Sequence, residues 1–297
     1  MCYKRHHARK SLEERVSLQV SIVIPTRSRA RQLTALLDSL AMQCGAEDVN
    51  WETILVDDAG EESERIAIEQ YLKTWKASPV RLHVLETRGG VSRARNTGVE
   101  LSRGEVIAFL DDDILVDRGF LAETARAHAA HPEILVLNGK LQKAREDYYS
   151  QFWHYHYSAA FDRALDSPYR VNRVASGFCS VKRGLLERVP VLFDESLPSR
   201  EDFDLLLRLR EEGIAVFKHD SIIGYHDFRT NLPSLLRQRL WYQEGQRAVR
   251  LKYGEAVLRA FNQSEDPVRR PWKFFPLYAS IRLTGYANGI WRRLWSR

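Results

Sequence analysis

Four apolar runs rich in β-branched residues recur through the first 113 residues, and each run ends at a polar turn. The runs are residues 20–25, 53–56, 80–85 and 106–110. Helix-like segments follow the first three of them at a spacing of about 30 residues, as in strand-to-helix units. This alternation predicts an α/β fold with a Rossmann-like, mostly parallel central sheet flanked by helices. In such sheets, ligands bind at the carboxyl ends of the strands, which is where the polar turns fall.

The pattern is less regular after residue 140. We expect a strand or hairpin over 172–182 and amphipathic helices over 203–212 and 234–252. The sequence therefore predicts one domain with an appended helical extension at the C-terminus. We set the boundaries at a basic N-terminal segment 1–17, an α/β domain 18–255, and a basic aromatic tail 256–297.

Positive charge gathers at the two ends of the chain. The formal net charge is +6; the first 15 residues carry +3 and residues 268–297 carry +7, which leaves −4 for the residues between. The tail also holds seven aromatic residues: Trp272, Phe274, Phe275, Tyr278, Tyr286, Trp291 and Trp295. Aromatic and basic side chains together are typical of a segment at a membrane surface. The alternative is a helix that packs on the domain or in a dimer, and the sequence leaves the oligomeric state open.

Other features bear on partners and cellular location. The three cysteines are widely spaced and form no CxxC pair, which argues against a disulfide framework or a structural zinc site. No run of 18 apolar residues occurs, and the charged start lacks the apolar region of a signal peptide. We expect a cytoplasmic protein, peripheral on the inner face of the cytoplasmic membrane if the tail binds lipid. No nucleic-acid-binding motif accompanies the charge, so we expect no nucleic-acid partner.

The most specific signal is a run of three carboxylates, Asp111, Asp112 and Asp113, directly after the apolar run 106–110. Carboxylates this close repel each other unless a cation intervenes. Mg²⁺ and Mn²⁺ take hard oxygen ligands and complete their shells with phosphate oxygens and water. The run therefore indicates a metal site that is shared with a diphosphate. A solvated acidic turn is the alternative.

A second carboxylate pair, Asp57 and Asp58, follows the run 53–56. Neighbouring parallel strands would bring this pair and the aspartate run to the same edge of the sheet. A carboxylate there can accept hydrogen bonds from a nucleobase or a ribose hydroxyl. An Asx turn or a helix N-cap is the alternative.

Five segments in this order and spacing resemble family 2 glycosyltransferases with the GT-A fold. They are Ser21-Ile-Val-Ile-Pro-Thr26, Val56-Asp-Asp58, Gly89-Gly-Val-Ser-Arg-Ala-Arg-Asn-Thr-Gly98, Gly104-Glu-Val-Ile-Ala-Phe-Leu-Asp-Asp-Asp113 and Arg200-Glu-Asp202. The resemblance covers about residues 20–255. It implies a GT-A domain with a nucleotide-binding half, 18–115, and an acceptor-binding half, 116–255.

The resemblance also implies the reaction. A metal-dependent, inverting enzyme would move one sugar from a nucleotide-diphosphate sugar, with UDP as the expected nucleotide, to an acceptor hydroxyl. The acceptor would be a saccharide, a lipid-linked saccharide or another hydroxyl compound, in the synthesis of a polysaccharide, glycolipid or other glycoconjugate. Spanning helices and the full motif of processive synthases are absent from the sequence, so transfer of single sugars is favoured.

By the same resemblance, ten residues would bind the donor nucleotide. They are Pro25, Thr26, Arg27, Asp57, Asp58, Gly90, Arg93, Arg95, Asp111 and Asp112. Pro25 and Thr26 would line the base pocket, Asp58 would bind the nucleobase imide, and Asp112 would hold the ribose or sugar. A helix N-terminus with nearby arginines is a natural anion site, although ordinary ion pairing explains part of that charge equally well.

The remaining assignments concern metal, catalysis and acceptor. Asp113 and His226 would hold Mn²⁺ or Mg²⁺. Inverting displacement needs a base on the acceptor side, and the resemblance points to Asp202, with Glu201 orienting it or contacting the acceptor. Helix capping by Asp202 is the alternative.

The expected acceptor-binding residues are Trp153, Tyr155 and Gly177. Aromatic faces stack on sugars, but they also fill cores, so both interpretations stay open here.

Two other classes of function remain. An apolar strand that ends in Asp-Asp-Asp superficially resembles the haloacid dehalogenase phosphatases, in which the first aspartate, here Asp111, is a nucleophile. That motif normally lies near the start of the domain, whereas three strand units precede it here. A nonenzymatic carbohydrate-binding relative of the fold is the other alternative.

Overall fold

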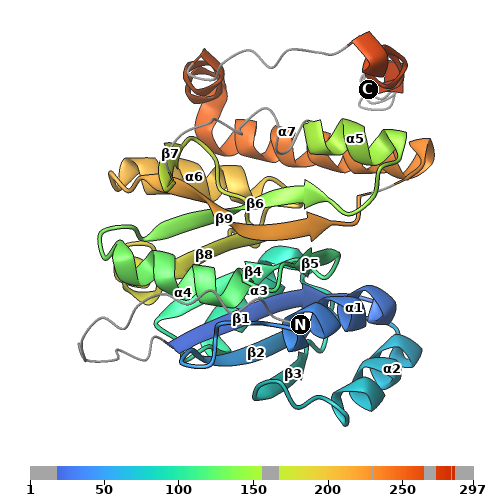
Figure 1. Cartoon of the computed structure of the whole chain (residues 1–297). Coiled ribbons are helices and arrows are strands. Elements are labelled where there is room, and N and C mark those ends of the chain that lie inside the picture. The colour runs from blue at the N-terminus through green and yellow to red at the C-terminus, as the bar shows by residue number, and fades with distance from the viewer. Residues whose placement is uncertain (1–18, 156–166, 229, 264–271, 282, 285–297) are drawn as a thin grey trace.

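The computed structural model describes residues 19–155, 167–228, 230–263, 272–281 and 283–284. A nine-stranded sheet forms the middle layer of the molecule, and helices cover both of its faces (Figure 1). The α/β fold expected from the sequence is confirmed. The predicted N-terminal segment 1–17 lies outside the described residues, as do Tyr286, Trp291 and Trp295 of the tail.

The first half of the chain forms the parallel part of the sheet. Its strands are β1 (Gln19–Thr26), β2 (Asn50–Asp57), β3 (Val80–Val84) and β4 (Val106–Leu110), in the order β3-β2-β1-β4. Helices α1 (Ala30–Ala41), α2 (Glu62–Leu72) and α3 (Gly90–Leu101) connect them. All three strand pairings are parallel, so the four strands end at one edge, as the repeated pattern predicts.

The second half continues the sheet in mixed orientation. Its elements are β5 (Ile114–Val116), α4 (Phe120–Ala130), β6 (Val136–Lys143), α5 (Tyr148–His154), β7 (Tyr169–Val171), β8 (Phe178–Lys182), η2 (Arg183–Glu187), α6 (Glu201–Glu211), β9 (Val216–His226), α7 (Leu232–Gln263) and η3 (Trp272–Phe274). β8 lies antiparallel between β4 and β6, and β9 runs parallel to β6 and antiparallel to β5 and β7. The first half is therefore parallel throughout, as expected, whereas among the described strands of the second half only β6 and β9 pair in parallel.

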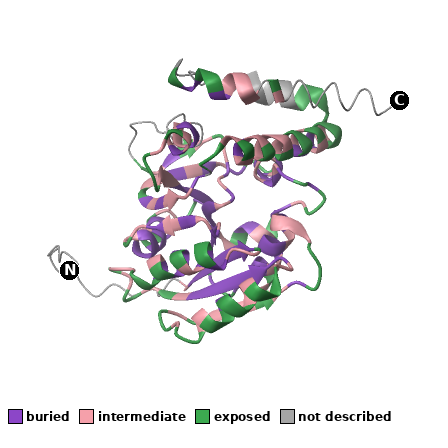
Figure 2. Ribbon diagram, turned by 90° about the vertical axis from the view of Figure 1, so that its right-hand side faces the viewer, coloured by how far each residue is buried: buried purple, intermediate pink, exposed green. Residues whose placement is uncertain are grey.

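Side-chain alternation along buried strands explains the layers. On β1, Ile22 and Ile24 point to a cluster that contains the apolar faces of α1 and α4, whereas Val23 points to a cluster with α3 and α6. Successive side chains of a strand face opposite sides of its sheet, so a strand covered on both faces must be apolar throughout. Figure 2 shows these central strands buried between helices whose outer faces are exposed.

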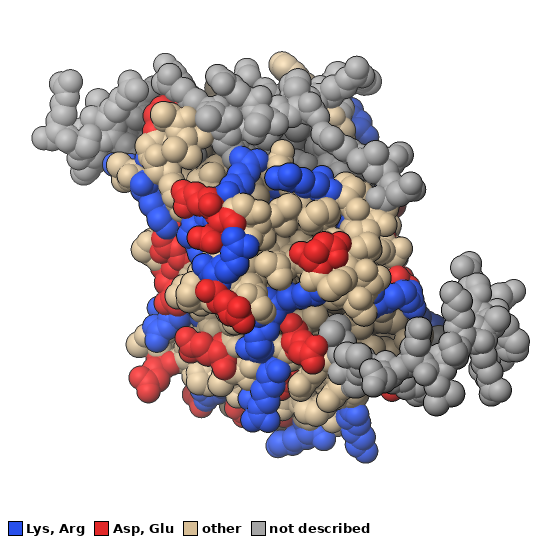
Figure 3. Space-filling view, turned by 90° about the vertical axis from the view of Figure 1, so that its left-hand side faces the viewer, with Lys and Arg blue, Asp and Glu red and all other residues tan. Residues whose placement is uncertain are grey.

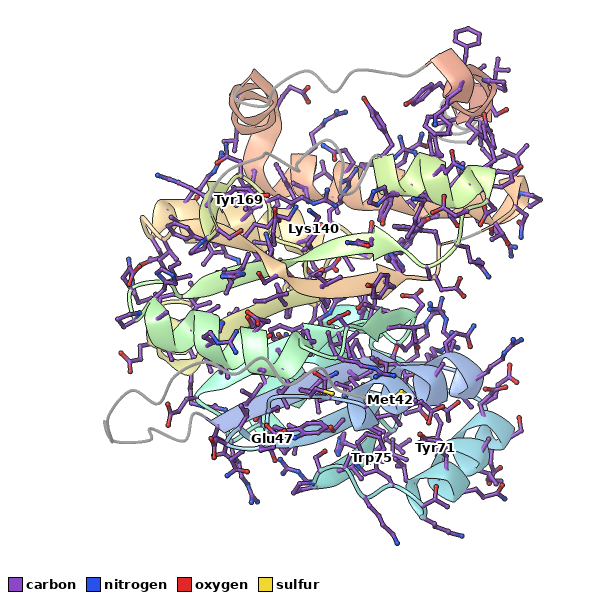
Figure 4. All side chains as sticks on the ribbon, viewed as in Figure 1. Met42, Glu47, Tyr71, Trp75, Lys140 and Tyr169 are labelled. Atoms are coloured by element: carbon purple, nitrogen blue, oxygen red, sulfur yellow. The ribbon has the colours of Figure 1, made fainter. Side chains whose placement is uncertain are left out.

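Polar contacts fasten the outer elements to these layers. Tyr71 of α2 donates to Asp38 of α1 at 2.5 Å, and Trp75 packs edge-on against Trp51 with 6.5 Å between the ring centroids. In the other half, Tyr169 donates to Asp220 at 3.3 Å, and the ammonium group of Lys140 lies 3.7 Å from the same carboxylate. Tyr71, Trp75, Lys140 and Tyr169 are labelled in Figure 4.

A third apolar cluster joins part of the tail to the body of the molecule. Phe274 and Leu277 are buried against Phe152 and Trp153 of α5 and Leu235 of α7. The described part of the tail therefore packs on the domain. In the sequence analysis this packing was the alternative to a membrane contact. No helix in the described ranges is long and apolar enough to cross a bilayer.

Two other expectations can be compared with the structure. Cys179 is free and buried, and Cys44 is disulfide-bonded, so the expectation of no disulfide framework does not extend to an isolated bond at Cys44. On the face shown in Figure 3, basic and acidic side chains of the described residues intermingle and form no continuous basic patch.

A buried carboxylate fastens α6 to α7. Asp204 is fully buried and accepts hydrogen bonds from Lys252 at 2.5 Å, Tyr253 at 2.6 Å and Arg208 at 2.8 Å. Lys252 also reaches Asp194 at 2.6 Å. Three donors satisfy the desolvated charge, which would otherwise destabilise the fold.

We expect Asp204→Asn to lower the free energy of unfolding by about 3 kcal/mol, because it leaves Lys252 and Arg208 beside a neutral group. Urea unfolding measures the change. Glu47→Gln, the same change of charge at an exposed position, is the control and should shift the midpoint negligibly. Equal midpoints for the two variants would show that Asp204 does not fasten α6 to α7.

Candidate functional site

A cavity of about 560 Å³ opens at the carboxyl ends of the parallel strands. Its walls come from the segments after β1, β2, β3 and β4, together with α6, α7 and the end of β9. Most of the predicted site residues line it: Pro25, Thr26, Arg27, Asp58, Gly90, Arg95, Asp111, Asp112, Asp113, Trp153, Gly177, Glu201, Asp202 and His226. Segments that are far apart in the sequence thus meet at the expected edge of the sheet.

Three predicted residues do not reach the wall of this cavity. Asp57 accepts a hydrogen bond from the amide of Gly60 at 3.0 Å, so it forms the local turn that was its alternative interpretation. The side chain of Arg93 lies against the backbone of Gly89. Tyr155 packs on Phe274, with 6.2 Å between the ring centroids, in the apolar cluster that holds the tail.

An arginine that the sequence analysis missed neutralises two carboxylates of the aspartate run. Arg29 precedes α1, and its guanidinium donates to Asp112 at 2.8 Å and to Asp113 at 3.1 Å. Asp112 also accepts from the hydroxyl of Thr26 at 2.8 Å. Burial raises the pKa of Asp112 to about 6, although Arg29 acts in the opposite direction. A cation at a helix N-terminus opposes the helix dipole, and this unfavourable placement could have indicated a second role for Arg29.

Asp113 and His226 meet although 112 residues separate them in the sequence. The imidazole Nε2 of His226 lies 3.2 Å from the carboxylate of Asp113. The pairing of β5 with β9 sets this contact, since Ile114 lies opposite His226 in the ladder. Burial disfavours the charged imidazole, but the negative charge of Asp113 outweighs it and raises the pKa of His226.

Asp58 organises the loop that begins α3. Its two carboxylate oxygens accept hydrogen bonds from the amides of Gly89 at 2.6 Å and Gly90 at 3.0 Å. The carboxylate therefore occupies the amides that we expected to bind a ligand anion at this helix N-terminus. Asp58 still lines the cavity, so any contact with a nucleobase would add to this structural role.

Arg95 is a buried arginine that connects two distant carboxylates. It extends from α3 and donates to Asp111 at 2.6 Å and to Glu201 at 2.8 Å. Ser176 also donates to Glu201, at 3.1 Å. Burial raises the pKa of Glu201, and the charge of Arg95 opposes that rise. The structure thus pairs Glu201 with Arg95, and no hydrogen bond connects Glu201 to Asp202 within the described residues.

Gly177 provides the space for this arrangement. A Cβ atom at Gly177 would lie 2.1 Å from a carboxylate oxygen of Asp111. The amide of Asp111 also donates to the carbonyl of Gly177 at 2.9 Å, which fixes the turn after β4 against β8. Any larger residue would displace Asp111, so glycine is required here by close packing.

Asp202 lies in the first turn of α6 and faces the cavity. One of its oxygens accepts from the amide of Phe203 at 2.8 Å. In the described part of the chain the other oxygen has no hydrogen-bond partner. Trp153, Gln238 and Trp241 line the same cavity. Gln238 and Trp241 of α7 were not predicted as site residues, because their segment matches the motif of processive synthases only in part and the sequence does not show where the helix lies in space.

Comparison with protein families identifies this architecture. The model of the family described as "Glycosyl transferase family 2" matches residues 21–189. An uncharacterized glycosyltransferase of Haemophilus influenzae is 26% identical over 248 residues, which cover 82% of this chain and 80% of that protein. A poly(ribitol-phosphate) beta-N-acetylglucosaminyltransferase, TarS of Staphylococcus aureus, is 26% identical over 62% of this chain, but the matched part is only 31% of its own length.

Solved structures of the same fold are also similar. TarS residues 1–349 in complex with UDP-GlcNAc align with a TM-score of 0.57 at 20% identity, covering 76% of this chain and 66% of that one. The mannosyltransferase PcManGT of Pyrobaculum calidifontis, in complex with GDP-Man and Mn²⁺, aligns with a TM-score of 0.60 at 19% identity, covering 91% and 70%. At 19–20% identity, the similarity to these two structures shows the fold alone.

The two adjacent acids of α6 should differ in their effect on stability. Glu201→Gln removes a charge that pairs with the buried guanidinium of Arg95, and we expect it to lower the free energy of unfolding by about 3 kcal/mol. Asp202→Asn keeps the oxygen that accepts from the amide of Phe203, so it should change the free energy of unfolding by less than about 0.5 kcal/mol. Urea unfolding of both variants tests the difference, and the opposite order would remove the structural role assigned to Glu201.

Proposed function

The chain belongs to glycosyl transferase family 2, and on this premise we propose that it transfers one sugar from a nucleotide-diphosphate sugar to an acceptor hydroxyl with inversion. One observation carries the proposal: the same cavity is lined by the Asp113 and His226 pair and by Asp202. The first pair suits the diphosphate, and Asp202 suits the acceptor.

The donor would bind along the loops of the parallel strands. Pro25, Thr26 and Asp58 line this part of the cavity and suit the nucleoside. Arg27 and Arg88 line it as well and supply positive charge for phosphate oxygens. Fixed positive charge beside a departing diphosphate stabilises the transition state. Asp112, held by Thr26 and Arg29, suits a ribose or sugar hydroxyl. We propose UDP as the nucleotide, and GDP is the main alternative outcome of a donor screen.

A divalent cation fits this site only together with a diphosphate. Asp113 and His226 offer one oxygen and one nitrogen ligand, and within the described residues no group of three His, Cys, Asp or Glu side chains could hold a metal. Mg²⁺ and Mn²⁺ bind through one or two carboxylates and complete their shells with phosphate oxygens and water. Asp113 and His226 would hold the ion, which would neutralise charge on the leaving diphosphate.

Asp202 would act as the general base. Its uncommitted oxygen faces the cavity, so it can accept the proton of the acceptor hydroxyl as that hydroxyl attacks the anomeric carbon. Glu201 cannot share this task while its carboxylate pairs with Arg95, so we assign it a positioning role. Trp241 is 39% exposed and provides a face on which an acceptor sugar can stack. Trp153 is buried in the apolar cluster with Phe274, so its ring fills the core behind the cavity wall.

Family membership favours this proposal over both alternatives. A phosphatase would need Asp111 as its nucleophile, but Arg95 holds that carboxylate at 2.6 Å. A nonenzymatic binding protein would need no carboxylate at Asp202 and no pair at Asp113 and His226. The proposed reaction uses all three groups.

Release of nucleoside diphosphate tests the proposal. Purified protein with Mn²⁺ and a panel of nucleotide sugars should release the diphosphate of one of them. We expect Asp202→Asn to lower kcat by more than about a hundredfold and to leave donor binding unchanged, because the base acts after binding. Asp113→Asn should weaken Mn²⁺-dependent binding of the nucleoside diphosphate about tenfold or more.

Glu47→Gln is the control for these assays, since its carboxylate is exposed and far from the cavity. Full turnover by the Asp202→Asn variant would exclude Asp202 as the base. Phosphate release from phosphomonoesters that Asp111→Asn abolishes would favour the phosphatase. Binding without any turnover would favour a carbohydrate-binding protein.

We also propose that the tail contacts an anionic membrane surface, where a lipid-linked acceptor would be available. Phe275 and Leu283 are each 70% exposed on the described part of the tail, and residues 268–297 contain seven Lys or Arg and no acid. Exposed apolar side chains beside basic ones suit an anionic headgroup layer.

Sedimentation with vesicles tests this contact. The full chain should bind phosphatidylglycerol vesicles at low salt, bind phosphatidylcholine vesicles weakly, and bind several-fold less well after Phe275→Ser, because burial of that ring is lost. Met42→Ser, at the exposed residue that follows α1, is the matched control. Equal binding by the two variants would show that the tail is not the contact.

A further inference from the structure

We propose that Arg200 binds an anionic group, a phosphate or a carboxylate, on the acceptor. This inference rests on the proposed function and names the class of acceptor that the same cavity takes. Three features of Arg200 are unfavourable for the free protein, and each becomes understandable if its guanidinium receives an anion from the cavity.

The backbone of Arg200 is the first feature. Its φ of 70° and ψ of 21° lie in the left-handed region, which costs free energy for any residue with a side chain. The first turn of α6 maintains this conformation, because the amides of Phe203 and Asp204 both donate to the carbonyl of Arg200, at 3.1 and 3.0 Å. The left-handed turn directs the chain into α6 and sets the position of the Arg200 side chain.

The guanidinium group is the second feature. It stacks on Tyr242 with its Cζ 5.0 Å from the ring centroid, and its Nε is buried without a hydrogen-bond partner. Across the described residues the group forms no hydrogen bond and no ion pair. A buried donor without an acceptor is destabilising, and this one belongs to a residue that lines the cavity.

The surrounding charges are the third feature. Arg200 stands at the N-terminus of α6, where the helix dipole disfavours a cation. The first turn contains three acids. Glu201 pairs with Arg95, Asp204 pairs with Lys252 and Arg208, and within the described residues no ion pair joins Arg200 to Asp202. The charge of Arg200 is therefore available for a ligand.

The contact between α7 and the segment before α6 fixes this geometry. Ser199 donates to the carbonyl of Trp241 at 2.9 Å. A Cβ atom at Gly245 would lie 2.1 Å from the hydroxyl of Ser199, so only glycine allows α7 to approach so closely. This approach brings Trp241 and Tyr242 beside Arg200 on the cavity wall. Arg200 is held in place before any ligand binds, which lowers the entropic cost of binding.

The position of Arg200 assigns it to the acceptor. Only one residue separates it in sequence from Asp202, the proposed base, and its neighbours on the wall come from α7. The donor loops have arginines of their own, Arg27 and Arg88. A guanidinium presents a planar pair of donors that matches a carboxylate or a phosphate. The anion would therefore lie within one or two sugar units of the hydroxyl that is glycosylated.

Binding of small anions to the whole chain tests the proposal. The probes are glycerol 1-phosphate and glucuronate, with glycerol and glucose as their neutral counterparts, titrated with and without the nucleoside diphosphate chosen by the donor screen. The wild type should bind at least one anion and discriminate against its neutral counterpart. Arg200→Gln should weaken that binding about tenfold and leave nucleoside diphosphate affinity within about twofold. Arg103→Gln, at an exposed arginine, should change neither affinity.

The outcomes are distinct. A loss confined to glycerol 1-phosphate indicates a phosphate-bearing acceptor, and a loss confined to glucuronate indicates a uronic acid; either supports the proposal. If Arg200→Gln weakened binding of the nucleoside diphosphate by the same factor, Arg200 would belong to the donor site and the proposal would be overturned. Absence of anion binding by the wild type, or binding that Arg200→Gln leaves intact, would also overturn it. Urea unfolding verifies that Arg200→Gln is folded. The anion titration without nucleotide does not depend on sugar transfer, so it can succeed or fail separately from the proposed function.

Discussion

The buried guanidinium of Arg95 holds the two halves of the molecule in register. It belongs to α3, in the parallel part of the sheet, and it reaches Asp111 in the turn after β4 and Glu201 at the start of α6. A buried arginine without acids would be strongly destabilising, and so would either acid without the arginine. The three groups therefore stabilise one another only when α3, β4 and α6 are correctly assembled. Assembly of the fold and assembly of the cavity are thus the same event.

Internal pairing of the carboxylates also shapes how the site can bind ligands. Arg29 bridges Asp112 and Asp113, and Asp58 holds the amides of Gly89 and Gly90. A ligand that binds here exchanges these contacts or adds to them. The net affinity for an incoming cation is lowered by the loss of the contact with Arg29, so a diphosphate that brings its own charge favours the exchange. On the proposed function, nucleotide and metal would therefore bind together.

Sequence predicts the first half of this molecule better than the second for a physical reason. The strands 20–25, 53–56, 80–85 and 106–110 are local apolar runs with a regular spacing, and each closely matches an observed strand. β9 alternates instead of running apolar throughout, and it is assembled by pairing with β5, β6 and β7 from distant parts of the chain. Asp113 and His226 could be proposed from a family resemblance, but their contact depends on that pairing. Arg29 was missed because its partners lie more than 80 residues away.

The apolar cluster that holds Phe274 and Leu277 bears on where the folding unit ends. This cluster includes Trp153, which also lines the cavity. It also includes Phe228, which packs against His226 with 4.2 Å between the ring centroids. The boundary drawn at residue 255 follows a change in composition, yet the hydrophobic contacts continue across it. A protease that cut the chain there would expose the inner faces of α5 and α7 to water. The described part of the tail therefore belongs to the same packed unit as α5 and α7, and losing it should weaken the cavity wall at Trp153.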